Sequence, residues 1–161
     1  MSRSLLIKNV VIKNHETNKD CVDVLVQDGK IKKIASNLEV SSGDQVFEGK
    51  GRWLLPSFID MQVHLRSPGQ EEKEDLTSGT KAAARGGYTH VACMPNTRPV
   101  LDDPSLLHWI NEQVRLKKTY AHVYPIAAMT KGMEGKKIAP YQDYKNAGII
   151  AITDDGYDVQ D

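Results

Sequence analysis

The sequence has few cysteines, no excess of charge of either sign and no long apolar run. Cys21 and Cys93 are its two cysteines among 161 residues, too few for the disulfide framework of a small secreted domain. No run approaches the roughly 20 apolar residues of a membrane-spanning helix, and no apolar signal segment opens the sequence. We therefore expect a reduced, cytoplasmic protein with no membrane span, in which both thiols are buried.

The charges cancel, with 21 Lys and Arg residues against 21 Asp and Glu residues. With this balance, no basic surface argues for binding to nucleic acid and no polybasic tract argues for binding to a membrane surface. A small-molecule substrate is the expected partner. With 40% hydrophobic residues, the chain is long enough for one ordinary domain, or for a small domain plus part of a larger one.

The first 55 residues have the pattern of a small β module. Residues 5–13 are rich in β-branched side chains and too short for a typical helix, which predicts a strand. A second strand is expected at 22–26 and a third at 31–34. Asp28-Gly29 between them is a strong hairpin signal, because a tight primed turn needs positive φ at its central residues. Gly43, Gly49 and Gly51 are expected to end the module.

From residue 56 onward, apolar strands alternate with helical segments. The expected strands are 56–66, 90–95, 121–128 and 149–153, and the expected helices are 70–85, one that begins at Asp102-Asp103-Pro104, and 141–146. This alternation is typical of a parallel α/β fold.

Polar residues gather where these strands end. Alternation along residues 56–66 would place Asp60, Gln62, His64 and Arg66 on one face, and polar residues also close the strands at 94–98 and 153–156. Because the carboxyl ends of parallel strands carry the site in such folds, we expect the groups to converge. A histidine and a carboxylate there are zinc ligand types, and bound zinc generates hydroxide at neutral pH.

The remaining polar groups at these strand ends suit substrate binding. Arg66 is suited to bidentate capture of a carboxylate, and Asn96 offers both a donor and an acceptor. Taken singly, His64 could be a structural histidine, and Asp154-Asp155-Gly156 could be an ordinary turn. The coincidence of polar ends on three strands favours a site.

Four segments, residues 59–69, 79–87, 94–99 and 153–156, resemble dihydroorotase of the bacterial single-polypeptide class, in the amidohydrolase superfamily. The resemblance is to the N-terminal part only. It implies an α/β fold in which residues 56–161 form the first half of a (β/α)8 TIM barrel, about four βα units and apparently truncated, and residues 1–55 form a small β-sandwich module before it. It also implies zinc-dependent, reversible cyclisation of N-carbamoyl-L-aspartate to dihydroorotate in pyrimidine biosynthesis.

The resemblance also implies roles for individual residues. His64 matches the second histidine of the family's His-x-His metal motif, and Asp155 its metal-ligating aspartate, with Asp154 as the alternate. Arg66 and Asn96 match its binders of the substrate carboxylate. The general base and the remaining metal ligands are expected beyond Asp161, so the chain holds no catalytic residue of its own and is expected to be inactive in isolation.

Gln62 departs from the family pattern at the most important position. It stands where the family has the first histidine of His-x-His, and a neutral amide is not among the usual zinc ligands. Zinc is therefore expected to bind weakly or not at all. Ser57 and Ser67 also replace the usual Gly and Glu, which suggests relaxed constraint along this strand.

Two alternatives to the dihydroorotase activity stay open. One is a non-catalytic homologue that acts as a scaffold or assembly partner, and the other is a hydantoinase-like or allantoinase-like amidohydrolase. Half a barrel would leave open strand edges. We therefore expect that the chain is a fragment of a longer protein, or that a homo-oligomer or a partner chain covers the edge.

Overall fold

The computed structural model describes residues 4–13 and 20–159. The chain divides into two compact units, residues 1–56 and 57–161, and each is described by itself. Among the described residues, no helix is both long and apolar enough to cross a membrane.

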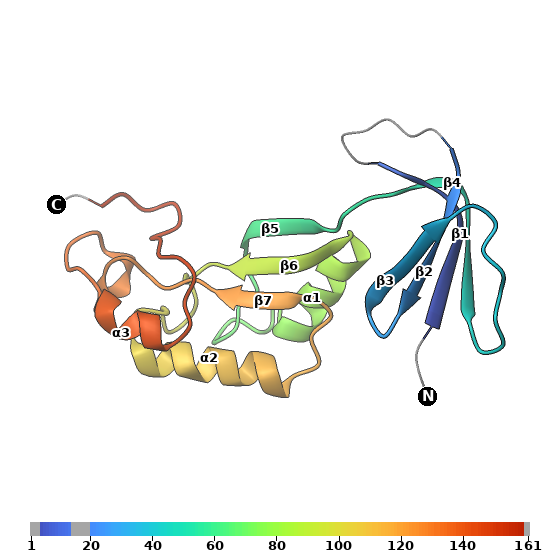
Figure 1. Ribbon diagram of the computed structural model, residues 1–161. Coiled ribbons are helices and arrows are strands. Elements are labelled where there is room, and N and C mark those ends of the chain that lie inside the picture. The colour runs from blue at the N-terminus through green and yellow to red at the C-terminus, as the bar shows by residue number, and fades with distance from the viewer. Residues whose placement is uncertain (1–3, 14–19, 160–161) are drawn as a thin grey trace. The chain divides into compact units, whose positions relative to one another are not determined.

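The first unit is one four-stranded sheet. Its strands are β1 (Ser4–Ile12), β2 (Val22–Gln27), β3 (Lys30–Ala35) and β4 (Gln45–Leu54), in the order β3-β2-β1-β4 (Figure 1). β2 runs antiparallel to both β1 and β3, whereas β4 runs parallel to β1. The described residues of this unit form a single sheet, so they do not make the two packed sheets of the expected β-sandwich.

The turn between β2 and β3 confirms the hairpin prediction. Asp28 and Gly29 have φ of 50° and 75°, the pair of positive values that a type I′ turn requires. The turn matches the right-handed twist of the flanking strands, so this local pair of residues explains why β2 and β3 associate.

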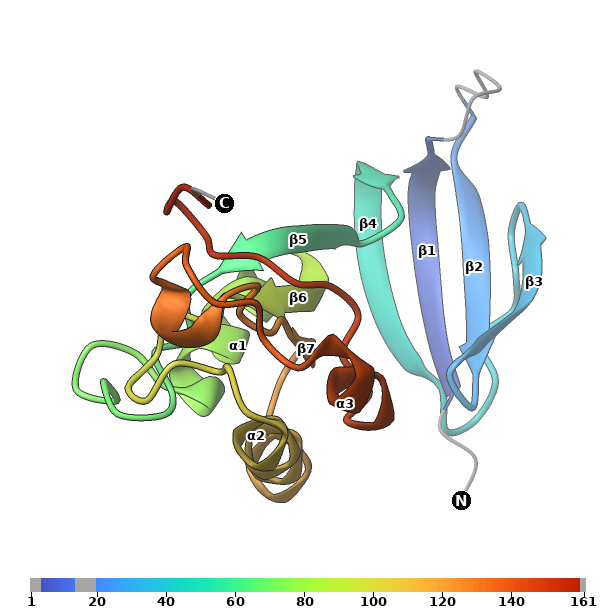
Figure 2. The ribbon, with the colours of Figure 1, turned by 90° about the vertical axis from the view of Figure 1, so that its left-hand side faces the viewer.

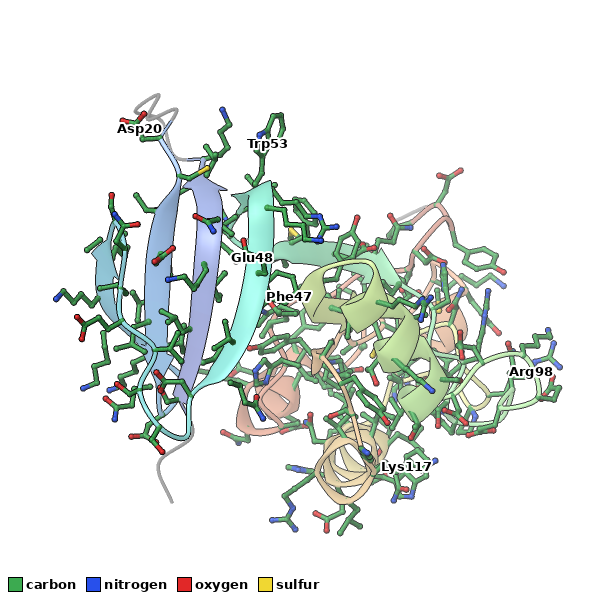
Figure 3. The ribbon with its side chains drawn as sticks, turned by 90° about the vertical axis from the view of Figure 1, so that its right-hand side faces the viewer. Asp20, Phe47, Glu48, Trp53, Arg98 and Lys117 are labelled. Carbon is green, nitrogen blue, oxygen red and sulfur yellow. The ribbon has the colours of Figure 1, made fainter. Side chains whose placement is uncertain are left out.

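Strand β4 was not predicted, because its glycines look like turn residues. Gly49 instead lies where two backbones meet closely: a Cβ there would fall 2.3 Å from Val10 Cγ1. Beside it, the register between β1 and β4 shifts between Lys8 and Val10, and Gly51 has a φ of 76°. Glycine within a strand often marks such an irregularity. At the end of β4, the labelled Trp53 side chain projects outward and is 68% exposed (Figure 3).

The expectation of two buried thiols is half right. Cys93 is buried, but Cys21 is exposed.

The second unit is a parallel sheet with helices on one face. β5 (Phe58–Val63), β6 (Tyr88–Cys93) and β7 (His122–Pro125) pair in chain order. The helices are α1 (Leu76–Arg85), α2 (Pro104–Leu116) and α3 (Tyr141–Asn146), with a short 3-10 turn at Lys131–Met133. α1 and α2 lie on the same side of this sheet (Figure 1).

Capping residues explain where the two longer helices begin. The Asp75 carboxylate accepts hydrogen bonds from the backbone of Thr77 and Ser78, so α1 begins at Leu76 rather than near residue 70 as expected. Asp103 caps α2 in the same way and precedes Pro104 at the first turn, which confirms the helix start predicted there.

The core of this unit lies between the sheet and the helices. The strands contribute Val91, Cys93 and Val123, and the helices contribute Leu76, Leu107 and Ile110. Alternate strand residues thus face the helices, as a half-buried sheet requires. Packing in this core fixes the positions of the strands against the helices. It thereby fixes the positions of the loops at the carboxyl ends of the strands.

The expected fourth strand is reduced to a single bridge. Residues 149–153 contact the sheet through one parallel bridge between Ala127 and Ile152, with hydrogen bonds from Ala127 N to Ala151 O and from Thr153 N to Ala127 O. The described residues therefore form three strands and a bridge rather than four full βα units. An apolar run predicts burial, but the length of a strand depends on its pairing partner.

Candidate polar site at the strand ends

A bulge in β5 changes which of its side chains share a face. Asp60 pairs with Val91, but Val63 pairs with Cys93, so β5 has one extra residue between these positions. Asp60 therefore lies on the helix-covered side with Val91, whereas Gln62, next to Val63, lies on the other. Because β5 ends at Val63 and Arg66 has a φ of 56°, the predicted single row of four polar residues is wrong.

Four side chains meet in one hydrogen-bonded group, which we call the polar cluster: Gln62 of β5, His64 of the loop after it, Asn96 of the loop after β6, and Asp155 of the segment after α3. Gln62 Nε2 donates to Asp155 Oδ1 at 3.1 Å, and Asn96 Nδ2 donates to Asp155 Oδ2 at 2.9 Å. His64 Nδ1 lies 2.9 Å from Asn96 Oδ1. Since the amide oxygen can only accept, His64 donates from Nδ1.

The segment after α3 brings Asp155 to this place. Figure 2 looks toward the carboxyl ends of β5, β6 and β7, and the red segment after α3 passes across them. The bridge between Ala127 and Ile152 holds this segment beside the sheet. Asp155 itself has a φ of 55°, and its backbone N–H donates to Thr153 Oγ1 at 3.0 Å. Thr153 is thus a supporting residue whose role the sequence did not reveal.

The neighbouring carboxylate of Asp154 lies in a different network. It is 2% exposed and accepts hydrogen bonds from the backbone N–H groups of Met129 and Thr130 at 2.8 and 3.0 Å, and from the Thr130 hydroxyl. The structure therefore separates the two candidates: Asp155 belongs to the polar cluster, and Asp154 closes the loop after β7.

The loop after β5 carries Arg66. Its backbone carbonyl accepts from Gln70 N at 3.0 Å, but the Arg66 guanidinium has no hydrogen-bond or ion-pair partner within the described part of the chain. The carboxylate of Glu71 holds this loop by accepting from Ser67 Oγ at 2.9 Å and from Gly69 N at 2.8 Å, and the hydrogen bond from Ser67 is the main reason why the pKa of Glu71 lies below its usual value. Arg98 N donates to Pro68 O at 3.0 Å, which joins this loop to the one after β6.

Glu71 was missed by the sequence reasoning, and Ser67 was read as relaxed constraint. Ser67 is instead 3% exposed and serves as a donor in this loop. The only feature of the sequence that could have indicated this hydrogen bond is the four-residue spacing of the Ser67 hydroxyl and the Glu71 carboxylate, on either side of Pro68-Gly69. Ser57 likewise has a partner, Thr89 Oγ1 at 2.6 Å from its Oγ.

A small cavity of about 210 Å³ lies beside the polar cluster. Its lining is Met61, Gln62, Met94, Ile126, Ala151, Ile152, Thr153 and Asp155. The walls are mostly apolar, and two members of the polar cluster reach them. A pocket with a few convergent polar groups is the usual form of a small-molecule site.

The side chains of the polar cluster do not fit a zinc ion. His64 and Asp155 are ligand types, but Gln62 directs an amide N–H, not a lone pair, at the carboxylate. No group of three His, Cys, Asp or Glu side chains that could hold a metal occurs in residues 4–13 and 20–159. A zinc site needs three or four such ligands.

The family model described as Dihydro-orotase-like matches residues 51–161. Among curated proteins, the chain is 42% identical over 155 residues to a dihydroorotase of Thermoanaerobacter sp. (strain X514), covering 96% of this chain and 36% of that protein. It is 44% identical over 161 residues to a dihydroorotase of Sulfurihydrogenibium sp. (strain YO3AOP1), covering 98% and 37%. The chain thus spans about a third of the length of these relatives.

Solved structures share the fold. An L-hydantoinase from Arthrobacter aurescens matches with a TM-score of 0.76 at 18% identity, over 94% of this chain and 32% of that one. A dihydroorotase structure matches with a TM-score of 0.65 at 14% identity, over 92% and 41%. The resemblance noted from the sequence is confirmed by the family match: the chain belongs to the dihydro-orotase-like family.

Proposed function

We propose that this chain is part of a dihydroorotase-type cyclic amidohydrolase, which interconverts N-carbamoyl-L-aspartate and dihydroorotate in the cytoplasm. Ring closure joins the ureido nitrogen to the side-chain carboxyl carbon and releases water. The curated relatives named above carry this activity in their names. We further propose that β5, β6 and β7 are the first strands of a (β/α)8 barrel, with residues 1–55 as a side module.

The observation that carries this proposal is the convergence of His64, Asn96 and Asp155. They come from the ends of β5 and β6 and from the segment after α3, and hydrogen bonds of 2.9 Å link them in series. Residues so far apart in sequence need a common reason to meet, and a site at the carboxyl edge of a parallel sheet supplies one.

Substrate binding is proposed for Arg66 and Asn96. The Arg66 guanidinium has no partner in the described part of the chain, so it is free to bind the carboxylate that carbamoyl aspartate and dihydroorotate share. Asn96 has a second amide N–H beyond the one given to Asp155. A carboxylated ring therefore suits these residues better than the uncharged ring of a hydantoin.

We propose that the 161-residue chain alone does not turn over substrate and holds zinc weakly or not at all. Of the metal ligands expected from the resemblance, it brings together only His64 and Asp155, and no general base stands among the residues assigned to the site. The rest of the machinery, or a second copy or partner chain along the open strand edge, would have to complete it.

A non-catalytic homologue is the second candidate, and the hydrogen bond from Gln62 to Asp155 favours it. An amide in place of an imidazole would be compatible with a chain that keeps the fold for assembly. Turnover of dihydroorotate by the protein that contains this chain would exclude this candidate.

Calorimetric titration of the full chain with dihydroorotate tests substrate binding. Replacement Arg66→Ala is expected to weaken binding by about tenfold or more, since it removes a charge-assisted pair. Arg98→Ala is the matched control, because Arg98 is exposed and its labelled side chain points outward from the neighbouring loop (Figure 3). Equal binding by Arg66→Ala, or equal binding of hydantoin, which lacks the carboxylate, would contradict the proposal.

A further inference from the structure

Both oxygens of the Asp155 carboxylate are occupied by side-chain amides. Gln62 Nε2 donates to Oδ1 at 3.1 Å and Asn96 Nδ2 donates to Oδ2 at 2.9 Å. A carboxylate cannot donate when ionised, so both amides must present N–H to it. Each oxygen of the Asp155 carboxylate therefore faces an N–H dipole.

The orientation of each amide is fixed from its other side as well. Asn96 Oδ1 accepts from His64 Nδ1, so turning the Asn96 amide over would break two hydrogen bonds at once. The backbone of Gln62 is held by its N–H, which donates to Asp60 Oδ1 at 3.0 Å, at the bulge that directs its side chain to this face. The fold thus presents the Gln62 amide to Asp155 before any ligand arrives.

Among the described residues, the carboxylates of Asp154 and Asp60 are held elsewhere and do not replace the one that the amides occupy. Asp154 is buried against the backbone of Met129 and Thr130. Asp60 lies on the helix-covered side of β5, where it accepts from the Gln62 backbone. A cation at the polar cluster would therefore meet His64 and one carboxylate whose lone pairs face amide hydrogens.

We propose that Gln62 is a positioning residue that takes the place of a metal ligand: its amide locks Asp155 into a hydrogen-bonded cluster that excludes a divalent metal. If Gln62 turned its Oε1 toward a cation, it would lose its hydrogen bond to Asp155. The metal bond gained would be weak, because an amide oxygen is a poor zinc ligand. The inference rests on the proposed function for the position of the site. Its tests measure metal uptake and amide protection, so either proposal can fail alone.

Zinc titration by calorimetry is the first test, made on the full chain with circular dichroism to verify folding. The wild type is expected to bind no stoichiometric zinc at this site. Gln62→His adds an imidazole beside His64 and Asp155 and is expected to tighten zinc binding by about tenfold or more, an effect removed by Asp155→Asn in the same chain. Gln142→His, on the exposed surface of α3, controls for adding a histidine elsewhere.

The proposal is overturned if the wild type binds one zinc as tightly as Gln62→His and loses it with Asp155→Asn. If neither protein takes up zinc, nuclear magnetic resonance of the side-chain amides decides. The Gln62 and Asn96 amide protons are expected to exchange with solvent more slowly than those of the exposed Gln142, and Asp155→Ala is expected to abolish the difference. If the Gln62 amide protons of the wild type exchange as fast as those of Gln142, the proposed hydrogen bond that holds Asp155 is contradicted.

Discussion

Asp154 and Asp155 are adjacent in sequence, but their carboxylates serve separate networks. Asp154 is buried and accepts from the backbone of Met129 and Thr130, whereas Asp155 accepts from the amides of Gln62 and Asn96. The positive φ of Asp155 accompanies this division, because it turns the chain between the two residues. One carboxylate thus stabilises the loop and the other faces the cavity.

Replacement Asp154→Ala is expected to lower the free energy of unfolding by about 3 kcal/mol. It leaves buried backbone N–H donors without a hydrogen-bond acceptor, and no water replaces the lost carboxylate. Asp155→Ala, in a more open position, is expected to cost less than about 1 kcal/mol. Urea denaturation of both variants measures the difference. Equal losses would show that the two carboxylates are not divided in this way.

The loop that carries Arg66 is expected to lose stability in acid through Glu71. Its pKa is lowered in the folded state from the ordinary value of 4.5, chiefly by the Ser67 hydroxyl. A lowered pKa gives stability that is fully present above the unfolded value and is lost as pH falls through the folded one. Because the carboxylate is exposed and its interactions are screened by solvent, Glu71→Gln is expected to cost at most about 0.5 kcal/mol at neutral pH, and progressively less as the pH falls below the ordinary value of 4.5.

Glu72→Gln is the control for this measurement, because Glu72 is the exposed neighbour in sequence. Denaturation midpoints of the three proteins across pH give the comparison. A difference between wild type and Glu71→Gln that does not shrink as the pH falls below 4.5 would contradict the assignment.

The packing of α2 against the sheet predicts a clear contrast along one helix. Ile110 is 0% exposed and Leu116 is 68% exposed. Ile110→Ala is expected to cost about 3 kcal/mol of unfolding free energy, from lost burial and the cavity left behind, and Leu116→Ala less than about 0.5 kcal/mol. If thermal and urea unfolding rank the two variants equally, α2 does not pack on the sheet as described.

The two thiols are expected to differ in reactivity. Burial raises the pKa of the Cys93 thiol to about 12, so almost none of it is the reactive thiolate at neutral pH. Cys21 is exposed. A thiol reagent is therefore expected to label one cysteine per chain quickly in the native state and two in denaturant, with Cys21→Ser abolishing the fast phase. Fast labelling of both in native protein would place Cys93 at the surface.

Features set by a few neighbouring residues could be predicted from the sequence. Asp28-Gly29 specifies its turn through its own φ angles, and Asp103-Pro104 specifies the start of α2 through a local cap. Features that depend on pairing between strands far apart in sequence could not be predicted from it. β4 was hidden because Gly49 is needed for close approach to Val10, and the apolar run 149–153 could not reveal that it would pair at a single bridge.

The site follows the same division. The rule that strand ends converge was enough to expect His64, Asn96 and Asp155 near one another, and the structure brings them together. The rule could not say which of Asp154 and Asp155 belongs to the site, because that depends on the hydrogen bonds that Asp154 accepts from Met129 and Thr130. The hydrogen bond between Gln62 and Asp155 was not predicted either, because it depends on the bulge in β5, which the alternation of the sequence does not reveal. The metal and substrate roles of these residues stay predictions.

A crystal of the full chain soaked in zinc, with diffraction data collected at the zinc absorption edge, tests the central claim most directly. The account predicts no anomalous peak at the polar cluster and a Gln62 amide that still donates to Asp155 near the present 3.1 Å. A zinc peak between His64 and Asp155, with Gln62 turned away, would contradict it.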